Sequence, residues 1–200
     1  MKNTNQGGLK RWGLLALFLL VPFLSGCALL VATGVVSGVG AGVAMSQDRR
    51  TSGMFVEDEA IEQKGSRRLS ERYGSDVHVN ITSYNRNVLL TGEAPSESVK
   101  REIESLVKGV ENVRNVVNEI AIGSVNSFAS RSNDTLITSK VKGRFIDGGK
   151  FQVNHVKVVT ENGVVYLLGL VTRNEAASAV EIAGSTSGVR KVVKVFEYIG

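Results

Sequence analysis

The stretch VHVNITSYNRNVLLTGEAPSES at residues 77–98 returns in a related form as NHVKVVTENGVVYLLGLVTRNE at residues 154–175. Gly92 of the first stretch matches Gly169 of the second at an offset of 77 residues. Further along, GVENVRNVV from residue 109 matches GVRKVVKVF from residue 188, at an offset of 79. Matching blocks in the same order indicate that one structural unit is present twice.

Both copies show the same order of predicted elements. Apolar residues at helical spacing predict two helices per copy, and alternation of apolar and polar residues predicts the strands between them. The first copy reads as helix 57–73, strands 77–83 and 87–92, helix 96–108 and strand 113–122, and the second as helix 133–146, strands 154–161 and 164–169, helix 172–185 and strand 189–199. The sequence therefore predicts an α+β fold of two tandem αββαβ domains, each a three-stranded mixed sheet covered by two helices.

Turn and capping residues support these boundaries. Asn162-Gly163 is a strong two-residue hairpin signal. Ser96 is placed to cap one helix, and Thr172 with Glu175 has the spacing of a capping box at another. Gly92 and Gly169 lie where a strand is predicted to give way to a helix, so we expect a close backbone approach there that leaves no room for a side chain.

The N-terminus has the layout of a secretory signal. Lys2, Lys10 and Arg11 precede an apolar run of 13 residues, and the small pair Ser25-Gly26 follows just before Cys27. The run is short for a membrane span, which needs about 20 residues. LSGC at residues 24–27 resembles the lipobox of bacterial lipoproteins, in which the cysteine receives a lipid and becomes the mature N-terminus. Cys27, the only cysteine, is the predicted lipid-attachment residue.

The segments expected from these signals are a signal peptide at 1–26, a lipidated glycine-rich tether at 27–56, domains at 57–122 and 133–200, and a linker at 123–132. The tether favours a flexible or membrane-surface segment. Gly34, Gly38 and Gly42 recur every four residues, which leaves open an inserted helix packed through its glycines.

The repeated pattern resembles the BON domain, a small bacterial module of envelope and osmotic-stress proteins. The resemblance rests on the strands VLLTG and VYLLGLV and on the closing strands that begin with Gly-Val. A lipobox followed by two such copies is similar to the dual BON-domain lipoproteins of Gram-negative outer membranes. This resemblance implies a lipid anchor in the outer membrane, with the domains facing the periplasm. Ala28 after the cysteine favours the outer membrane.

Charge separates the two copies. Residues 57–122 carry 9 basic and 12 acidic side chains, a net charge of −3, whereas residues 131–200 carry 10 basic and 6 acidic, a net charge of +4. From Cys27 onward the net charge is only +2, so the basic overall composition does not indicate nucleic-acid binding. The second copy is the one expected to lie against an anionic membrane surface.

The first helix of the second copy carries the predicted site. At 100° per residue, Ile137, Val141 and Phe145 form the stripe that faces the sheet, and Leu136 falls on the far side. An exposed leucine beside lysines suits an interfacial membrane contact, although single exposed leucines are also common on ordinary surface helices. The resemblance implies that this helix binds anionic phospholipid with Leu136 inserted. The predicted membrane-binding residues are Leu136, Ser139, Lys140, Lys142, Gly143, Arg144 and Ile146.

No set of catalytic residues is recognisable in the sequence. The two histidines, His78 and His155, fall at matching positions predicted to lie on the strand face opposite the buried valines and isoleucine. They are more readily explained as partly exposed strand residues inherited by duplication than as a metal or acid–base pair. We therefore expect no enzyme, no cofactor and no metal site.

Two functions remain open from the sequence. The first is a lipid-anchored protein that binds anionic phospholipid and helps maintain outer-membrane integrity. The second is a protein-interaction adaptor for envelope-assembly or cell-wall-remodelling machinery, in which lipid affinity is incidental.

Overall fold

The computed structural model of the chain describes residues 48–123 and 128–200. The predicted signal peptide, Cys27 and most of the predicted tether lie outside these residues. Within them no helix is long and apolar enough to cross a membrane.

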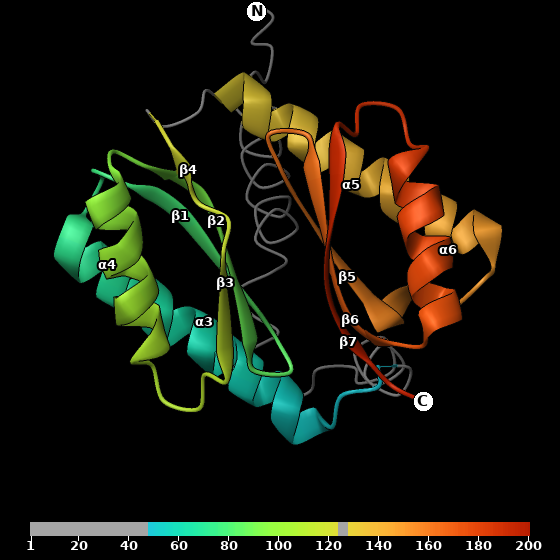
Figure 1. Ribbon diagram of the computed structural model, residues 1–200, viewed down its shortest axis with the longest axis horizontal. Helices are drawn as coiled ribbons and strands as arrows, with labels where there is room; N and C mark the ends of the chain where they lie inside the picture. The colour runs from blue at the N-terminus through green and yellow to red at the C-terminus, as the bar shows by residue number, and fades with distance from the viewer. Residues whose placement is uncertain (1–47, 124–127) are drawn as a thin grey trace, which may run out of the picture. The chain divides into compact units, whose positions relative to one another are not determined.

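The first copy contains the predicted elements with shifted bounds (Figure 1). Its elements are α3 (Ser52–Tyr73), β1 (His78–Tyr84), β2 (Asn87–Ala94), α4 (Glu97–Lys108), β3 (Asn115–Asn118) and β4 (Ala121–Ile122). The strand predicted at 113–122 is interrupted, because Glu119 and Ile120 separate β3 from β4 and both short strands pair with β2. The sheet therefore has four strands by this division, in the order β1-β2-β3 with β4 also on β2.

The second copy repeats this order with a continuous closing strand. Its elements are α5 (Phe128–Gly148), the 3₁₀ turn η2 (Val153–His155), β5 (Val156–Glu161), β6 (Val164–Val171), α6 (Arg173–Gly184) and β7 (Lys191–Tyr198). The sheet order is β5-β6-β7, with β5 and β6 antiparallel and β6 and β7 parallel. Both sheets are mixed, as the sequence predicts, because β1 and β2 are also antiparallel while β3 is parallel to β2.

Local signals explain several of these bounds. Asn162 and Gly163 both have positive φ, at 51° and 69°, as a tight hairpin turn requires. Ser96 accepts a hydrogen bond from the N–H of Val99, and Thr172 forms the predicted capping box with Glu175. By contrast, α3 begins at Ser52, five residues before the predicted start at 57, and Thr51 caps this earlier start.

The middle strand of each sheet is buried on both faces. In β2, Val88 and Leu90 belong to the core beneath α3 and α4, whereas Leu89 points to the opposite face. In β6, Val165 and Leu167 lie beneath α5 and α6, whereas Leu168 points away from them. The residues on the two helix-free faces form one apolar cluster of Tyr84, Leu89, Tyr166 and Leu168.

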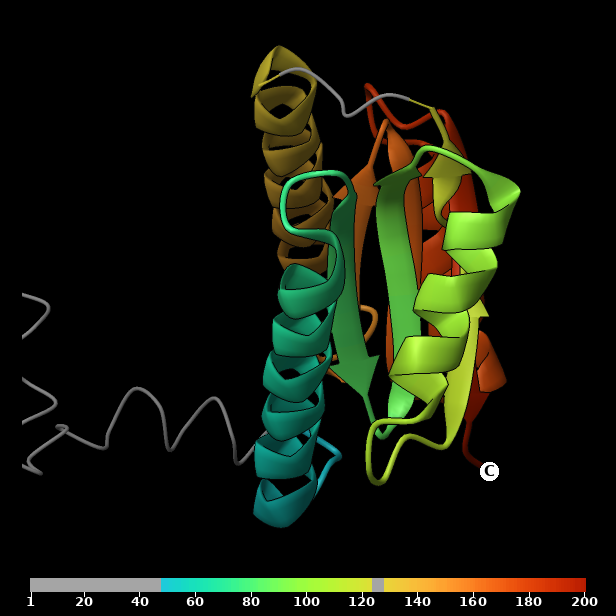
Figure 2. The same cartoon turned by 90° about the vertical axis from the view of Figure 1, so that its left-hand side faces the viewer.

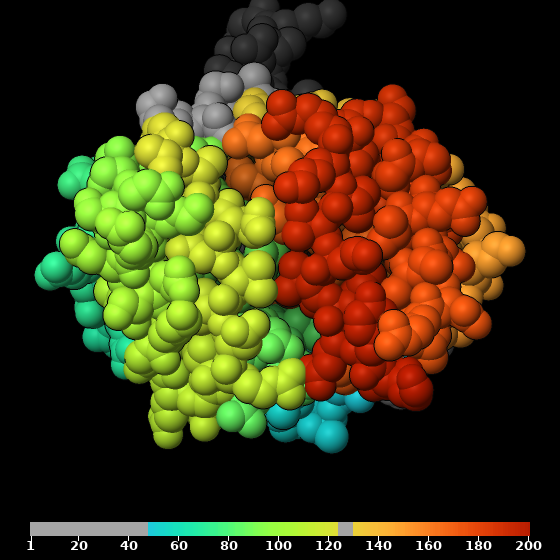
Figure 3. Space-filling view, in the orientation of Figure 1, coloured from blue at the N-terminus to red at the C-terminus, as the bar shows by residue number. Residues whose placement is uncertain are grey.

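The two sheets therefore pack against each other through the faces that carry no helix (Figures 1 and 2). Polar contacts surround this apolar cluster. Lys157 Nζ donates to Glu62 Oε1 at 2.9 Å, and Arg114 pairs with Glu197. Figure 3 shows the residues around β3, in yellow, lying against β7, in red. Side chains from domains of opposite net charge meet at this contact.

The segment just before α3 contacts both copies. The side chain of Arg50 is nearly buried between Asp48 and Asp58, and its guanidinium lies 4.0 Å from the centre of the Tyr84 ring. The neighbouring Arg49 donates to the carbonyl oxygen of Leu170 at 2.8 Å and pairs with Glu175 at 2.7 Å. The chain thus enters the folded body through contacts to α3 on one side and to α6 on the other.

Candidate membrane-binding site

The helix α5 is held against its sheet by one apolar stripe and one buried carboxylate. Ile137, Val141 and Phe145 are almost fully buried, as predicted. Asp134, at the same side of the helix, accepts hydrogen bonds from the backbone N–H groups of Asn162 and Gly163 at 2.8 and 2.7 Å. These contacts fix the rotation of α5 about its own axis, and they decide which residues face outward.

The outward face of α5 carries two large apolar side chains. Leu136 is 52% exposed and Ile146 is 67% exposed. Isolated exposed leucines are ordinary, but the equivalent positions of α3 hold Ala60 and Ser70 when the two helices are aligned on Asp58 and Asp134. At these two positions, exposed apolar residues are therefore particular to the second copy.

Two lysines accompany these apolar residues. Lys140 and Lys142 are both exposed, and neither has an ion-pair partner within residues 48–123 and 128–200. Ser139 and Gly143 lie between them on the outward face. The Ser139 hydroxyl donates to the carbonyl oxygen of Thr135 at 3.0 Å, and the position of a Cβ on Gly143 has no atom within 4 Å. This leaves a small-residue surface between the lysines.

Arg144 differs from these residues because it is engaged in packing. Its Nη1 donates to the carbonyl oxygen of Ile182 at 3.0 Å and to the Thr186 hydroxyl at 2.8 Å. Arg68, its counterpart on α3, makes a similar long contact to the carbonyl oxygen of Leu106. The shared contact indicates that Arg144 first of all joins the two helices of its domain.

The glycines predicted to be structural lie inside strands rather than at their ends. Gly92 pairs with Val79 across β1 and β2, and Gly169 pairs with Val156 across β5 and β6. A Cβ on Gly92 would lie 2.0 Å from the carbonyl oxygen of His78, and one on Gly169 would lie 2.3 Å from that of His155. Both glycines allow a backbone approach that a side chain would obstruct.

The histidines occupy matching positions, each just before the residue that pairs with a structural glycine, Val79 with Gly92 and Val156 with Gly169. His78 belongs to β1, whereas His155 ends the 3₁₀ turn before β5 and contacts Glu175 at 3.3 Å. Only the strand assignment differs from the prediction, because His155 ends a turn where His78 begins a strand. In the described part of the chain, no group of three or more histidine, cysteine or acidic side chains is arranged to hold a metal ion.

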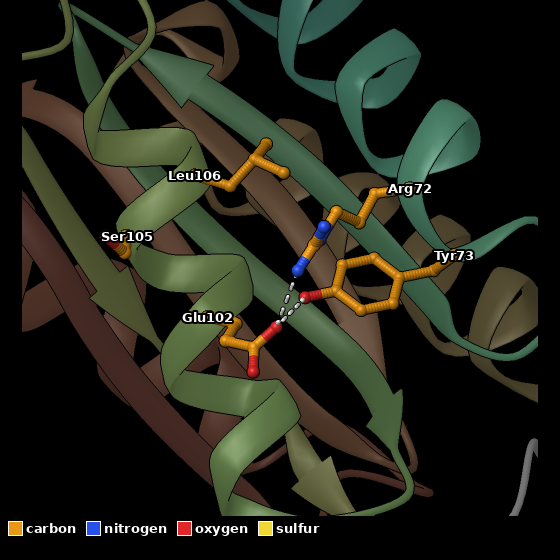
Figure 4. Close-up of a pocket in the computed structure, with 5 residues that line it drawn as sticks. All are labelled: Arg72, Tyr73, Glu102, Ser105 and Leu106. Atoms are coloured by element: carbon orange, nitrogen blue, oxygen red, sulfur yellow. Dashed lines mark hydrogen bonds and ion pairs between the residues drawn. The ribbon is translucent and has the colours of Figure 1, made fainter.

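A small pocket of about 280 Å³ lies between the helices of the first copy (Figure 4). Arg72 and the Tyr73 hydroxyl both point to the carboxylate of Glu102, at 3.5 and 3.1 Å. Both contacts end on one oxygen of the carboxylate, and the pair is exposed, so it contributes little to stability.

A second hollow, of about 360 Å³, borders α5 itself. Its lining comes from one flank of α5, from β1 and from the end of β5. Arg131, Asn80 and Glu161 lie here. They belong to three elements that are distant in the sequence, so no local pattern predicts that they share one hollow. This hollow is called the interdomain groove below.

Comparisons with known proteins agree with this architecture. The model of the family described as BON domain matches residues 57–124 and 133–200. The chain is 38% identical over 179 residues to the outer membrane lipoprotein DolP of Haemophilus influenzae, covering 88% of this chain and 91% of the relative. It is 34% identical over 154 residues to the 21 kDa hemolysin of Actinobacillus pleuropneumoniae, covering 76% and 79%.

A more distant relative has the same extent. The osmotically-inducible protein Y of Escherichia coli is 28% identical over 186 residues, covering 90% of this chain and 91% of the relative. The family match covers both repeated units, and the predicted α+β architecture of two copies is confirmed. The chain belongs to the BON-domain family and carries two BON domains in tandem.

Proposed function

We propose that this chain is a lipid-anchored protein of the outer membrane whose second BON domain binds anionic phospholipid through α5. The observation that carries the proposal is the outward face of this helix, where Leu136 and Ile146 are exposed beside Lys140 and Lys142. Apolar side chains that enter the acyl boundary, together with lysines that meet lipid phosphates, are what an interfacial helix needs. By holding the envelope's lipid surface, the protein helps maintain outer-membrane integrity.

The anchor in this proposal is Cys27. The supporting observations are the lipobox-like LSGC after a full signal, and the similarity to a relative that is named an outer membrane lipoprotein. Several acyl chains make membrane attachment stable where one is marginal. Metabolic labelling with a radioactive fatty acid tests this: the Cys27→Ala protein should take up no label, and undiminished labelling would refute the anchor.

The helix is tested by co-flotation with lipid vesicles. The protein is expressed without its signal peptide, and Cys27 is replaced by alanine. Removing the apolar contact with Leu136→Glu should weaken binding to anionic vesicles at least tenfold, because a fully buried leucine contributes about 1.5–3 kcal/mol. Val56→Glu is the matched control, since Val56 is 63% exposed on α3. It should bind as wild type does.

Charge is tested separately with Lys140→Glu at two salt concentrations. Its effect should be largest at low salt, because exposed charges are screened beyond about 8 Å at physiological ionic strength. Lys191→Glu, an exposed lysine of β7, is the control. If folded Leu136→Glu binds vesicles as wild type does, the membrane helix is refuted and the adaptor function takes its place.

A further inference from the structure

The interdomain groove runs beside the proposed membrane helix and combines residues of both BON domains. The residues that line it from α5 are Arg131, Asp134, Thr135, Thr138, Ser139 and Lys142. These positions recur at helical spacing and form the flank of α5 that faces the first domain. From β1 come His78 and Asn80, and from β5 come Thr160 and Glu161.

The floor of the groove is built from hydrogen-bonding groups. Thr138 of α5 donates its hydroxyl to that of Thr160 at 2.7 Å. Glu161 is buried, with 8% exposure, and its Oε2 accepts from Asn80 Nδ2 of the first domain at 3.1 Å. Among the described residues Oε1 of Glu161 accepts no hydrogen bond. The groove therefore offers a carboxylate oxygen to a donor from outside.

Cations stand at both ends of the groove. Arg131 and Lys142 are exposed and have no ion-pair partner in the part of the chain that the structure describes. They are eleven residues apart, or about 16 Å along the helix axis, so a single phosphate contacts one of them at a time. Ile146 lies one turn beyond Lys142 on the same flank, which brings this end of the groove to the proposed membrane surface.

We propose that the interdomain groove binds the head group of the phospholipid, with Arg131 or Lys142 beside the phosphate and with Glu161 and Asn80 hydrogen-bonded to a donor on the head group. This proposal rests on the proposed function and adds to it that the first domain takes part in lipid recognition. The ligand is a phosphodiester that carries a hydroxyl or ammonium donor beyond the phosphate. Within this proposal we assign the donor as a hydroxyl, of the kind that phosphatidylglycerol carries.

The electrostatics of Glu161 support this role. Burial raises the pKa of this carboxyl, and the neighbouring carboxylates of Glu93 and Asp134 raise it further, against the hydrogen bond from Asn80. The ionised form of Glu161 therefore lowers the stability of the folded protein. Ionisable groups that carry such a cost are typical of binding sites.

The test compares two anionic lipids of equal charge in a phosphatidylcholine background. Phosphatidylglycerol carries two head-group hydroxyls, whereas phosphatidylmethanol carries no donor. Wild type should bind the first about threefold to tenfold more tightly, which is the range of one net hydrogen bond. A third set of vesicles, with phosphatidylethanolamine in place of the anionic lipid, tests an ammonium donor, and equal or tighter binding there would overturn the assignment to a hydroxyl.

Two variants locate the effect. Glu161→Ala and Asn80→Ala should both abolish the preference for phosphatidylglycerol while they still bind phosphatidylmethanol as wild type does. Asn80 is exposed, so its variant keeps the test decisive even if Glu161→Ala is unstable. Asn174→Ala, an exposed asparagine of α6, is the matched control and should keep the full preference.

The outcomes separate this proposal from the proposed function. If wild type binds neither anionic vesicle, the membrane function itself fails. If wild type binds both equally, or if Asn80→Ala keeps the preference, the head-group site is refuted while the membrane helix stands. Leu136→Glu should weaken binding to both lipids and leave their ratio unchanged, because it removes apolar contact only.

Discussion

Asp58 of α3 and Asp134 of α5 hold the same position in the two domains, and each binds the backbone of its own hairpin turn. Asp58 accepts from the N–H groups of Asn85 and Arg86, both at 2.8 Å, just as Asp134 accepts from those of Asn162 and Gly163. Both carboxylates are buried. Each aspartate therefore ties the first helix of its domain to the turn between the first two strands.

Removal of this tie should destabilise the second domain. Asp134→Ala leaves two backbone N–H groups without their partner, so we expect a loss of about 2 kcal/mol or more. Urea unfolding at neutral pH measures it. Asp147→Ala, at an exposed aspartate of the same helix, is the control and should change stability by less than about 0.5 kcal/mol. Equal stabilities of the two variants would show that the tie is dispensable.

A side chain at Gly169 should be disruptive. Because a Cβ there would lie 2.3 Å from the carbonyl oxygen of His155, Gly169→Val must push β5 away from β6. We expect a loss of about 2 kcal/mol or more, seen as a lower melting temperature by circular dichroism. Gly143→Ala, which meets no atom within 4 Å, should keep or raise the melting temperature. A Gly169→Val protein that melts within a degree of wild type would contradict this view.

The contact between the sheets should couple the unfolding of the two domains. Leu168 is 1% exposed at the centre of the interdomain cluster, so Leu168→Ala should cost about 2–5 kcal/mol. We also expect the single unfolding transition of wild type to separate into two. Leu136→Ala removes a leucine from the surface and should alter neither. Two transitions already present in wild type would mean that the domains unfold independently.

Acid should weaken the contact between Arg49 and Glu175. The hydrogen bond from Arg49 is the main cause that lowers the pKa of Glu175 from 4.5 to about 2. The stabilisation is therefore fully present above pH 4.5 and is lost as the pH falls towards 2. Arg49→Met should be less stable than wild type at pH 7, and this difference should shrink at pH 3. Glu181→Gln, an exposed position of α6, provides the control in denaturant unfolding at both pH values.

Glu161 should show the opposite dependence. Its pKa is raised, chiefly by burial, so its ionised form is disfavoured in the fold. The cost is present above the folded pKa and disappears below the unfolded value of 4.5. Glu161→Gln should therefore stabilise the protein at pH 7, with the gain vanishing near pH 3. A destabilised Glu161→Gln protein at pH 7 would show that the carboxylate is held by contacts stronger than the cost of its burial.

Much of each domain could be predicted from local sequence. The alternation in β5, the Asn162-Gly163 turn, and the caps at Ser96 and Thr172 depend on neighbours a few residues away. The exposure of Leu136 follows from its angle to Ile137 and Val141. The sequence also contains a pattern for the buried aspartates. Asp58 and Asp134 each lie three residues before a buried isoleucine, at matching positions of the two copies.

Features that depend on distant residues were decided only by the tertiary structure. Leu89 and Leu168 are far apart in the chain. Their local sequence patterns do not predict that the helix-free face of each sheet is covered by the other sheet. The pairing of Asn80 with Glu161 likewise joins two domains. The sequence by itself determined the repeat, the order of its elements and the outward face of α5, because these follow from short-range periodicity and steric preferences. The tertiary structure decided which sheet faces meet and which polar groups share the interdomain groove, because those contacts arise from burial between segments that the sequence does not place side by side.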